Sequence, residues 1–566
     1  MPMPVLRAML VALALAVATI TLAQPPTAAE PAPAAPLDPL AEAIRERSDL
    51  LRYGNPDPRQ EFAVQGTHVV LGDFVAQFIE SQQFRPQWRD PARLDALIAA
   101  LADLRDDGLD PGDYHVERLQ SFRTDQRRAG GLTLAEQADL ELIATDAMAL
   151  ALYHLYAGKV DPVKLSSQWN FSSRAVSREF GLERLGEALA TGEIRRAFDL
   201  ARPQHAWYQR GRERLREYRA IAAAGGWSPI SDGPTLKAGA SDPRVPALRH
   251  RLQVSRDLVP SAPEPYPPSQ LYDAELEAAV KRFQERHGLT ADGAVGPGTR
   301  AALNVPVASR IDQIRVNLER GRWVLHEVHG EFVLVDVAGF HVSYFHDDQP
   351  VWTSRVVVGR PYRETPIFRS TITYVVLNPT WTIPPGILVK DKLPVIRRDP
   401  GYLTRNSIRV LDSNGREVDP HSVDWSRYSG GRLPPYQFRQ DPGDDNALGL
   451  VKIMFPNPYL VYLHDTPSKS LFDKDERTFS SGCIRVEKAF ELAERVLNDP
   501  ERWNRAAIDA AIASKRTQTV NLAKPVAVLI LYWTAQPRPD GQVIFRNDVY
   551  GRDPPTLAAL DSDFAR

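Results

Sequence analysis

The chain has 566 residues, of which 43% are hydrophobic and 25% are charged, and its formal net charge at pH 7 is −2. These values are ordinary for a soluble globular protein, and the length predicts two to four domains rather than one core. The near-neutral charge argues against nucleic acid as a partner and against electrostatic binding to a membrane.

The N-terminus predicts export. Arg7 precedes an uncharged apolar run over residues 8–22, and Thr21-Leu22-Ala23 offers the small residues that a signal peptidase reads. The run is short for a membrane span, which needs about 20 apolar residues. We therefore expect residues 1–23 to be a signal peptide, with an uncleaved anchor as the alternative. Residues 24–59 are rich in Pro and Ala and predict a disordered spacer.

Residues 60–240 are predicted to be mostly helical. Asp90 and Pro91 form an N-cap pair, and Thr133 with Glu136 forms a capping box that opens a long apolar helix ending at Gly158. No catalytic pattern stands out in this region. We expect a structural role, with a contribution to a substrate groove as the less favoured addition.

Residues 241–304 predict a compact unit of three short helices, punctuated by Asp292-Gly293 and Gly296-Pro297. A connecting helix is expected over residues 305–330. His326 and His329 raise the alternative of a metal peptidase, but a third ligand is missing nearby and such a pair is common on solvated surfaces. No metal is therefore expected.

Residues 331–553 change to a β-rich pattern typical of a sandwich or barrel. Strands are predicted at residues 332–337, 352–358, 371–377, 450–455, 459–463 and 527–533. A long insertion, residues 387–445, interrupts them and contains several prolines and glycines. Such an insertion is usually a functional lid or a disordered segment. Residues 554–566 are expected to be a C-terminal tail.

Cys483 is the only cysteine in the chain and stands in the run Ser480-Ser481-Gly482-Cys483. A single cysteine excludes an intramolecular disulfide and a site with several cysteine ligands, which leaves a packed thiol or a nucleophile. The small residues before it favour a nucleophile, because they let backbone N–H groups turn toward a bound carbonyl. His464, 19 residues upstream, is the candidate base for cysteine acyl transfer.

The neighbours of these two residues extend the candidate site. A strand over residues 459–464 would place Tyr462 and His464 on one face. A helix carrying Phe490 would follow Cys483 closely, and its N-terminus would lower the pKa of the thiol. Ordinary structural roles remain open: Tyr462 could fill the sheet surface, and Arg485 could pair with an acid or brace the loop.

The stretch from Tyr462 to Glu487, with HDTPSKSLFDKDERTFSSGCIRVE as its core, resembles the active-site motif of the L,D-transpeptidases of bacterial peptidoglycan. It resembles most the large periplasmic members of Gram-negative bacteria. Two positions depart from the common family pattern: Ser481 replaces a His, and Asp465 replaces a Gly. Residues 60–240 are similar to the scaffold domain of these enzymes, and residues 279–304 are similar to the peptidoglycan-binding repeat of many wall enzymes.

The resemblance implies a multidomain α+β protein. Its parts would be a helical scaffold domain (60–240), a three-helix peptidoglycan-binding-like domain (241–304) and a β-sandwich-like catalytic domain (331–553) with residues 387–445 as a lid. It also implies a periplasmic location, no cofactor, and peptidoglycan stem peptides as donor and acceptor. Other cell-wall synthesis enzymes are candidate partners. The binding-like domain would either hold the wall or act as a spacer.

The resemblance also implies roles for the site residues. Cys483 would attack the carbonyl between the L- and D-centres of a stem peptide and release D-Ala, with His464 as general base and acid. Backbone N–H groups of Gly482, Cys483 and Ser481 would form the oxyanion hole. The residues expected to contact substrate are Arg485, Tyr462, Trp381 and Asp465, although Trp381 could equally be buried in the core.

Two alternatives remain open at this point. The same thioester could be resolved by water, which would give an L,D-carboxypeptidase or an amidase. The second alternative is a non-catalytic wall-binding protein whose thiol has no role in chemistry. Covalent labelling by an acylating β-lactam would separate an enzyme from a binding module. The resemblance implies that the protein is a target of one class of these compounds, the carbapenems.

Overall fold

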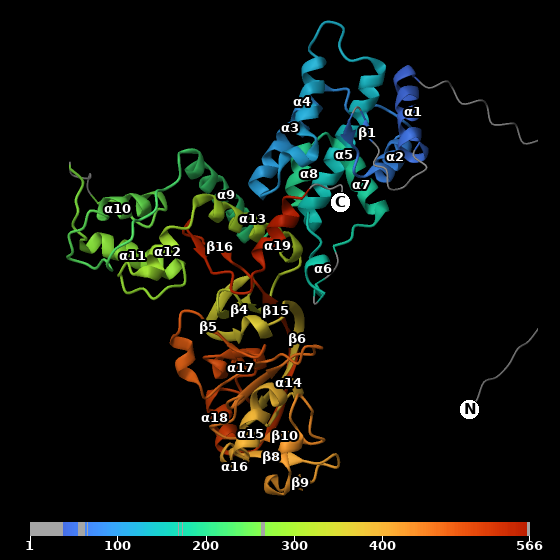
Figure 1. The fold of residues 1–566 in the computed structure, drawn as a ribbon. Helices are drawn as coiled ribbons and strands as arrows, with labels where there is room; N and C mark the ends of the chain where they lie inside the picture. The colour runs from blue at the N-terminus through green and yellow to red at the C-terminus, as the bar shows by residue number, and fades with distance from the viewer. Residues whose placement is uncertain are drawn as a thin grey trace, which may run out of the picture.

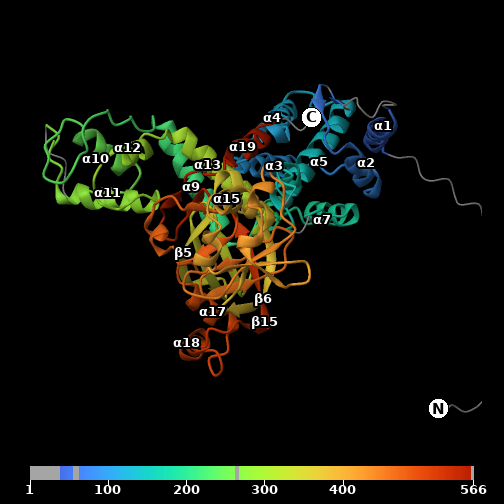
Figure 2. The same ribbon diagram turned by 60° about the horizontal axis from the view of Figure 1, so that its bottom comes forward.

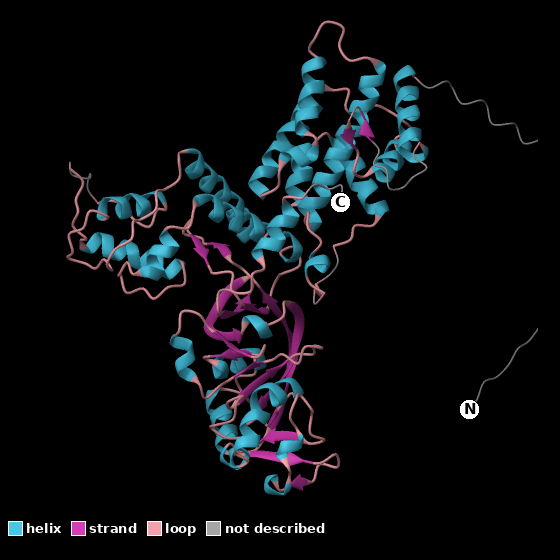
Figure 3. Cartoon of the chain, viewed as in Figure 1, coloured by secondary structure: helices cyan, strands magenta, loops and turns pink. Residues whose placement is uncertain are grey.

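The computed structural model describes residues 38–54, 63–64, 66–167, 169–171, 174–261 and 267–562. The predicted signal or anchor segment, residues 1–23, lies outside these ranges. In the described part of the chain, no helix has the length and apolar character that crossing a membrane requires. The first half of the chain is mainly helical and the second half carries the larger sheets (Figure 1; Figure 3), so the prediction of a multidomain α+β fold is confirmed.

Helix α5 (Leu134–Ala157) is the central element of the N-terminal region. Thr133 and Glu136 form the predicted capping box, and Gly158 ends the helix as predicted. Buried side chains lie all around α5, because other helices surround it. The other elements of this region are α2 (Gly72–Ser81), α3 (Pro91–Ala102), the 3₁₀ turns η1 (Asp103–Asp107) and η2 (Pro111–Tyr114), α4 (Val116–Asp125), α6 (Pro162–Leu165), α7 (Arg178–Thr191), α8 (Ile194–Ala201), α9 (Ala206–Ala223) and the short pair β1 (Ala63–Val64) and β2 (Thr67–His68); of these, α2, α3, η2, α4 and α8 contact α5.

The expected spacer over residues 24–59 contains a helix, so the prediction of disorder was wrong for part of it. Helix α1 (Pro39–Tyr53) begins after Asp38, whose side chain accepts a hydrogen bond from the Leu40 N–H. Its buried residues Leu40, Ile44 and Leu51 lie at helical spacing and pack toward α2 and α5. The Pro and Ala content of the segment concealed this apolar face.

The three predicted short helices form a unit with its own small core, made of α10 (Val245–Val254), α11 (Ala274–Arg286) and α12 (Pro297–Leu303). The unit projects to the side opposite α1, α2 and α7 (Figure 1; Figure 2). It packs against the hairpin of β16 (Ala535–Pro537) and β17 (Val543–Phe545). The His287 ring stacks on Phe545 at 5.7 Å, and Arg286 donates a hydrogen bond to the Val543 carbonyl.

The C-terminal half contains a nine-stranded mixed sheet. Strand β4 pairs with both β3 and β5, so all strands except β13 form a closed ring. Closure removes exposed edges from the ring. Helices α17 (Ala489–Leu497) and α18 (Arg505–Ala513) pack on it. The strands are β3 (Phe332–Asp336), β4 (His341–His346), β5 (Gln349–Gly359), β6 (Phe368–Leu377), β11 (Val451–Met454), β12 (Leu463–His464), β13 (Thr478–Ser480), β14 (Ile484–Val486) and β15 (Gln518–Leu531).

The long insertion is a folded subdomain at the end of the sheet away from the helical region (Figure 1). It has its own hydrophobic core, centred on Ile396, Val410 and Phe438, so the alternative of a disordered segment was wrong. The folded insertion begins at Trp381, before the predicted boundary at residue 387, because Trp381 and Ile383 belong to the same core. Its elements are β7 (Trp381–Thr382), α14 (Pro385–Ile387), a π-helical turn (Leu388–Lys392), α15 (Leu393–Arg398), α16 (Gly401–Arg405), β8 (Ile408–Leu411), β9 (Glu417–Val418), the 3₁₀ turns η5 (Pro420–Ser422) and η6 (Trp425–Arg427), and β10 (Gln437–Gln440). Its function as a lid stays a prediction.

Helix α13 (Val307–Val324) joins the helical region to the sheet and lies beside α9. Arg322 of α13 is fully buried; it forms an ion pair with Glu319 and donates hydrogen bonds to Tyr208 Oη at 2.9 Å and to the Asp107 carbonyl at 2.7 Å. The expected C-terminal tail was also wrong in part, because residues Asp553–Leu560 form helix α19, which packs on α13. Asp553 anchors α19 by pairing with Arg320.

We predict that Arg322→Met destabilises the helical region by about 3–5 kcal/mol, because it leaves the Glu319 carboxylate buried without its cation. Urea unfolding followed by circular dichroism measures the effect. Arg128→Met, which removes an exposed arginine paired with Asp125, is the matched control and should change the midpoint little. Equal midpoints for the two variants would contradict a structural role of the buried pair.

Candidate active site

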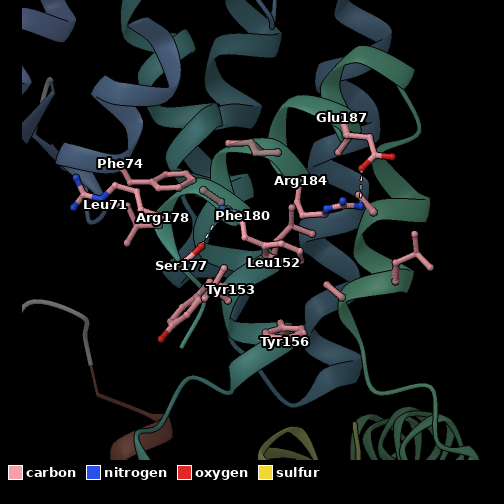
Figure 4. Close-up of a pocket in the computed structure, with 18 of the residues that line it drawn as sticks. Leu71, Phe74, Leu152, Tyr153, Tyr156, Ser177, Arg178, Phe180, Arg184 and Glu187 are labelled. Atoms are coloured by element: carbon pink, nitrogen blue, oxygen red, sulfur yellow. Dashed lines mark hydrogen bonds and ion pairs between the residues drawn. The ribbon is translucent and has the colours of Figure 1, made fainter. Parts of the chain in front are cut away.

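Two cavities stand out in the described part of the chain. The first, about 580 Å³, lies among α2, α5, α7 and α8 of the helical region and is lined mainly by apolar side chains such as Phe74, Leu152 and Phe180 (Figure 4). Its lining contains neither cysteine nor histidine. The second, about 720 Å³, is lined by Cys483, His464, Tyr462, Arg485 and Trp381. The second cavity therefore carries the chemistry that the sequence predicts.

The register of three short strands brings the site residues together. Strand β12 pairs in parallel with β14, so that Leu463 lies opposite Ile484 and His464 opposite Arg485. Side chains alternate along a strand. Leu463 therefore points into the core, while Tyr462 and His464 share the cavity face with ring centroids 5.6 Å apart. The predicted placement of these two rings is confirmed, but the predicted strand is shorter: β12 begins at Leu463, because Leu460 has φ +57°.

The loop before Cys483 is held by specific hydrogen bonds. Gly482 has φ +113°, a conformation that residues with a side chain rarely adopt. Its carbonyl accepts a hydrogen bond from Thr365 Oγ1 at 2.9 Å, and Ser480 Oγ donates to the Cys483 carbonyl at 2.6 Å. These bonds fix the direction in which Cys483 leaves the loop.

The backbone donors of this loop differ from the expected oxyanion hole in one respect. The Gly482 N–H donates to Ser480 Oγ at 3.1 Å and is buried. In the described structure, the N–H groups of Ser481 and Cys483 donate to no protein acceptor. Two of the three predicted donors are therefore free to bind an oxyanion, whereas the Gly482 N–H is already occupied by the Ser480 hydroxyl.

Cys483 is half-buried and opens on the cavity. Its thiol lies 3.6 Å from the Leu460 carbonyl oxygen, and both the backbone N–H and the phenol of Tyr462 hydrogen-bond to it. Burial raises the pKa of the thiol; the Tyr462 hydrogen bonds and the charges of Lys452 and Arg485 act in the opposite direction. The predicted lowering by a helix N-terminus was wrong, because β14 separates Cys483 from α17.

His464 is buried, and burial together with the Arg485 charge lowers its pKa to about 3. The imidazole is therefore neutral at neutral pH and able to accept a proton. Its Nδ1 atom lies 2.5 Å from the Asp465 carbonyl oxygen. That carbonyl orients the imidazole ring. Among the described contacts, Cys483 Sγ bonds to Leu460 and Tyr462 rather than to His464.

The other candidate residues fall into two groups. Trp381 lines the cavity, is only 8% exposed and donates a hydrogen bond to the Tyr462 hydroxyl, so it belongs to both the wall and the core of the insertion. Arg485 lines the cavity with a buried Nε that has no protein partner. Asp465 does not line it: its carboxylate accepts the Leu450 N–H at 3.0 Å and pairs with Lys469, because it follows His464 and turns to the opposite face.

The cavity is rich in positive charge. Residues of the insertion, including Trp381 and Lys390, form one wall, and the sheet forms the other. Five cations line it, and Asp391 is the single carboxylate among its lining residues; the cations are Arg360, Arg363, Lys390, Lys392 and Arg485. Asp391 pairs with Arg363. The cavity can therefore bind a ligand that carries carboxylates.

The alternative metal pair does not form a site. His326 packs against Tyr156 with ring centroids 5.2 Å apart, whereas His329 is exposed beside Asp348. Across the described ranges, no group of three or more His, Cys, Asp or Glu residues could hold a metal ion.

One residue of the site was missed from the sequence. Lys452 of β11 pairs with His464 of β12, and its ammonium lies 4.0 Å from the centroid of the Tyr462 ring. The sequence does contain a pattern that could have revealed Lys452. Val451, Ile453 and Phe455 alternate with Lys452 and Met454, which places the lysine on the face of the strand opposite the core.

Comparison with known proteins agrees with this geometry. Residues 330–524 match the family described as the L,D-transpeptidase catalytic domain, residues 73–215 match a scaffold domain, and residues 241–303 match a putative peptidoglycan binding domain. A protein of Haemophilus influenzae named putative L,D-transpeptidase is 35% identical over 241 residues, which are 43% of this chain and 48% of that protein. The match thus spans about half the length of that relative.

Two solved structures are also similar. An L,D-transpeptidase from Xylanimonas cellulosilytica is 15% identical, with a TM-score of 0.17, over 53% of this chain and 100% of that one. An L,D-transpeptidase from Stackebrandtia nassauensis is 13% identical, with a TM-score of 0.20, over 54% and 97%. The assignment rests on the domain matches and the curated relative instead. They give this chain one region similar to an L,D-transpeptidase catalytic domain, a second similar to a scaffold domain and a third similar to a putative peptidoglycan binding domain.

Proposed function

We propose that the protein is a peptidoglycan L,D-transpeptidase that uses Cys483 as its nucleophile. The observation that carries this proposal is one cavity, within the matched catalytic domain, that is lined by the single thiol of the chain together with His464, Tyr462 and Arg485. A neutral imidazole and a neutral thiol form the resting pair, because burial lowers the pKa of His464 and raises that of Cys483.

The reaction has two steps. First, Cys483 Sγ attacks the carbonyl carbon between the L- and D-centres of a donor stem, and its proton passes to His464. The C–N bond to the terminal D-Ala then breaks, His464 protonates the leaving amine, and a thioester remains. Second, an amine of another stem attacks the thioester and gives its proton to His464, which returns it to Cys483. The free N–H groups of Cys483 and Ser481 hold the oxyanion.

The positive charge of the cavity fits this substrate. The donor carries a terminal carboxylate next to the bond that is cleaved, and Arg485 is the lining cation closest in the chain to Cys483. Arg485 has a buried Nε without a protein partner, so a substrate carboxylate would satisfy it. We assign the donor carboxylate to Arg485, and the groove walls to Tyr462 and Trp381.

We also propose that the protein works in the periplasm, after export by the segment over residues 1–23, and that residues 241–304 hold the peptidoglycan wall. The supports are the apolar run after Arg7 and the match to a putative peptidoglycan binding domain. The insertion would act as a lid, since it forms one wall of the cavity.

The decisive experiment is mass analysis of products from the purified protein with a muropeptide carrying a tetrapeptide stem. We expect cross-linked dimers and free D-Ala, and no dimers from a pentapeptide donor. If only tripeptide monomer accumulates with ample amine acceptor present, water resolves the thioester and the protein is an L,D-carboxypeptidase.

Cys483→Ser should abolish turnover while circular dichroism stays unchanged, because a serine hydroxyl is a far weaker nucleophile at neutral pH. Incubation with a carbapenem should add one covalent mass to the parent protein and none to the variant. Turnover by well-folded Cys483→Ser protein would refute the cysteine mechanism.

His464→Ala should reduce the turnover rate by about 10²–10⁴-fold, the usual cost of losing a general base. The rate is measured by D-Ala release. Lys524→Ala, which removes an exposed side chain of β15 on the same domain, is the control and should retain the parent rate. A His464→Ala rate within a few-fold of the parent would mean that another group deprotonates Cys483.

A further inference from the structure

Lys452 is a cation that the proposed reaction has not yet used. It lies on β11, directly across the antiparallel ladder from His464. Its ammonium sits over the face of the Tyr462 ring, 4.0 Å from the centroid. The hydroxyl of the same ring hydrogen-bonds to the Cys483 thiol. Lys452 of β11, Tyr462 just before β12 and Cys483 just before β14 therefore form a continuous line of contacts.

The surroundings of Lys452 lack the partner that a buried cation ordinarily has. The side chain is half-buried, and burial lowers its pKa. In the described structure, the ammonium forms no ion pair with a carboxylate, and Cys483, when it is a thiolate, is the one group whose charge raises the pKa of Lys452. Lys469, by contrast, pairs with Asp465 on the other side of the strand. A cation held without an acid is stabilised when an anion forms nearby.

We infer that Lys452 is a positioning residue that stabilises the thiolate of Cys483 through Tyr462. When the thiol loses its proton to His464, the Tyr462 O–H donates a hydrogen bond to the sulfur anion. The ammonium draws electron density from the ring face, which makes the phenol a better donor, and its charge attracts the thiolate directly. The inference rests on the proposed function, because it concerns the nucleophile of that reaction.

Several charged groups face the thiol from the elements around it. From β12 there is His464, from β14 Arg485, and from the segment after β5 Arg360 and Arg363; the insertion contributes Lys390, Asp391 and Lys392. Of the cations, Lys452 and Arg485 are the two whose charges lower the pKa of Cys483. Arg485 is assigned to the donor carboxylate, which would neutralise it in the complex. Lys452 is not among the cavity-lining residues, so it stays available to the sulfur.

The test is the pH dependence of Cys483 alkylation by iodoacetamide, which reports the thiol pKa. The chain has one cysteine, so the modification is specific for this site. Lys452→Met keeps the length of the aliphatic side chain and removes the charge, and Lys452→Gln removes the charge with a polar side chain. Lys452→Arg restores the charge. Lys524→Met, the same change at an exposed position of β15, is the matched control.

We expect both neutral variants to move the alkylation midpoint upward by about one pH unit, the lower end of the effect of a nearby opposite charge. Lys452→Arg and Lys524→Met should keep the parent midpoint. The alkylation midpoint is a better readout than the alkylation rate at one pH. A thiolate becomes more nucleophilic as its pKa rises, and this gain partly offsets the smaller fraction of thiolate in the rate. An unchanged midpoint in folded Lys452→Met or Lys452→Gln protein would overturn the inference, and would leave lysine with a packing role only.

A reciprocal measurement covers the case in which the neutral variants do not fold. Coupling between two sites acts equally in both directions. Cys483→Ala should therefore lower the pKa of Lys452, measured by NMR of ¹³C-dimethylated lysines with Lys452→Arg to assign the signal. An unchanged Lys452 pKa would refute the coupling. These titrations need no donor substrate, so a parent protein that fails to cross-link muropeptides would refute the proposed function without affecting them.

Discussion

The parallel register between β12 and β14 is the constraint on which the rest of the site depends. It sets His464 opposite Arg485 and brings the Tyr462 ring beside the Cys483 thiol. Because side chains alternate along a strand, a slip of one residue would turn these groups into the core and bring apolar residues to the cavity. The core residues Leu463 and Ile484, both fully buried, hold the register. The same apolar contacts that stabilise the sheet therefore determine the chemistry on its other face.

Burial and positive charge act against each other at the thiol. Removing Cys483 from water disfavours the thiolate, and the lowered pKa of His464 makes the imidazole a weak acceptor of its proton. Both effects keep Cys483 and His464 themselves uncharged in the resting site. The cations around it have the reverse effect, because each favours an anion in the cavity. In the proposed reaction, the thiol would stay inactive until a substrate excludes water and strengthens the electrostatic interactions within the cavity.

Local patterns in the sequence were sufficient for much of the fold. The caps at Asp90 and Thr133 and the stop at Gly158 depend on a few adjacent residues, and the structure has them. The thiol and His464 were found from one motif. What the sequence did not reveal depends on contacts between distant segments. Lys452 meets Tyr462 only through strand pairing, and the Gly482 N–H is taken by Ser480 through the shape of the loop. The effect of α17 on the thiol was misjudged because a three-residue strand is too short to show a period.

Arg363 joins the two walls of the cavity, which the sequence separates by about a hundred residues. Its guanidinium donates a hydrogen bond to Ser481 Oγ at 2.9 Å and another to Asp391 of the insertion at 2.9 Å. One cation thus links the loop before Cys483, the proposed nucleophile, to the proposed lid. The pairing also neutralises Asp391, the sole carboxylate among the described lining residues, and leaves the other cations of the cavity without an acid. The contact that positions the insertion therefore also sets the positive potential that a donor carboxylate would meet.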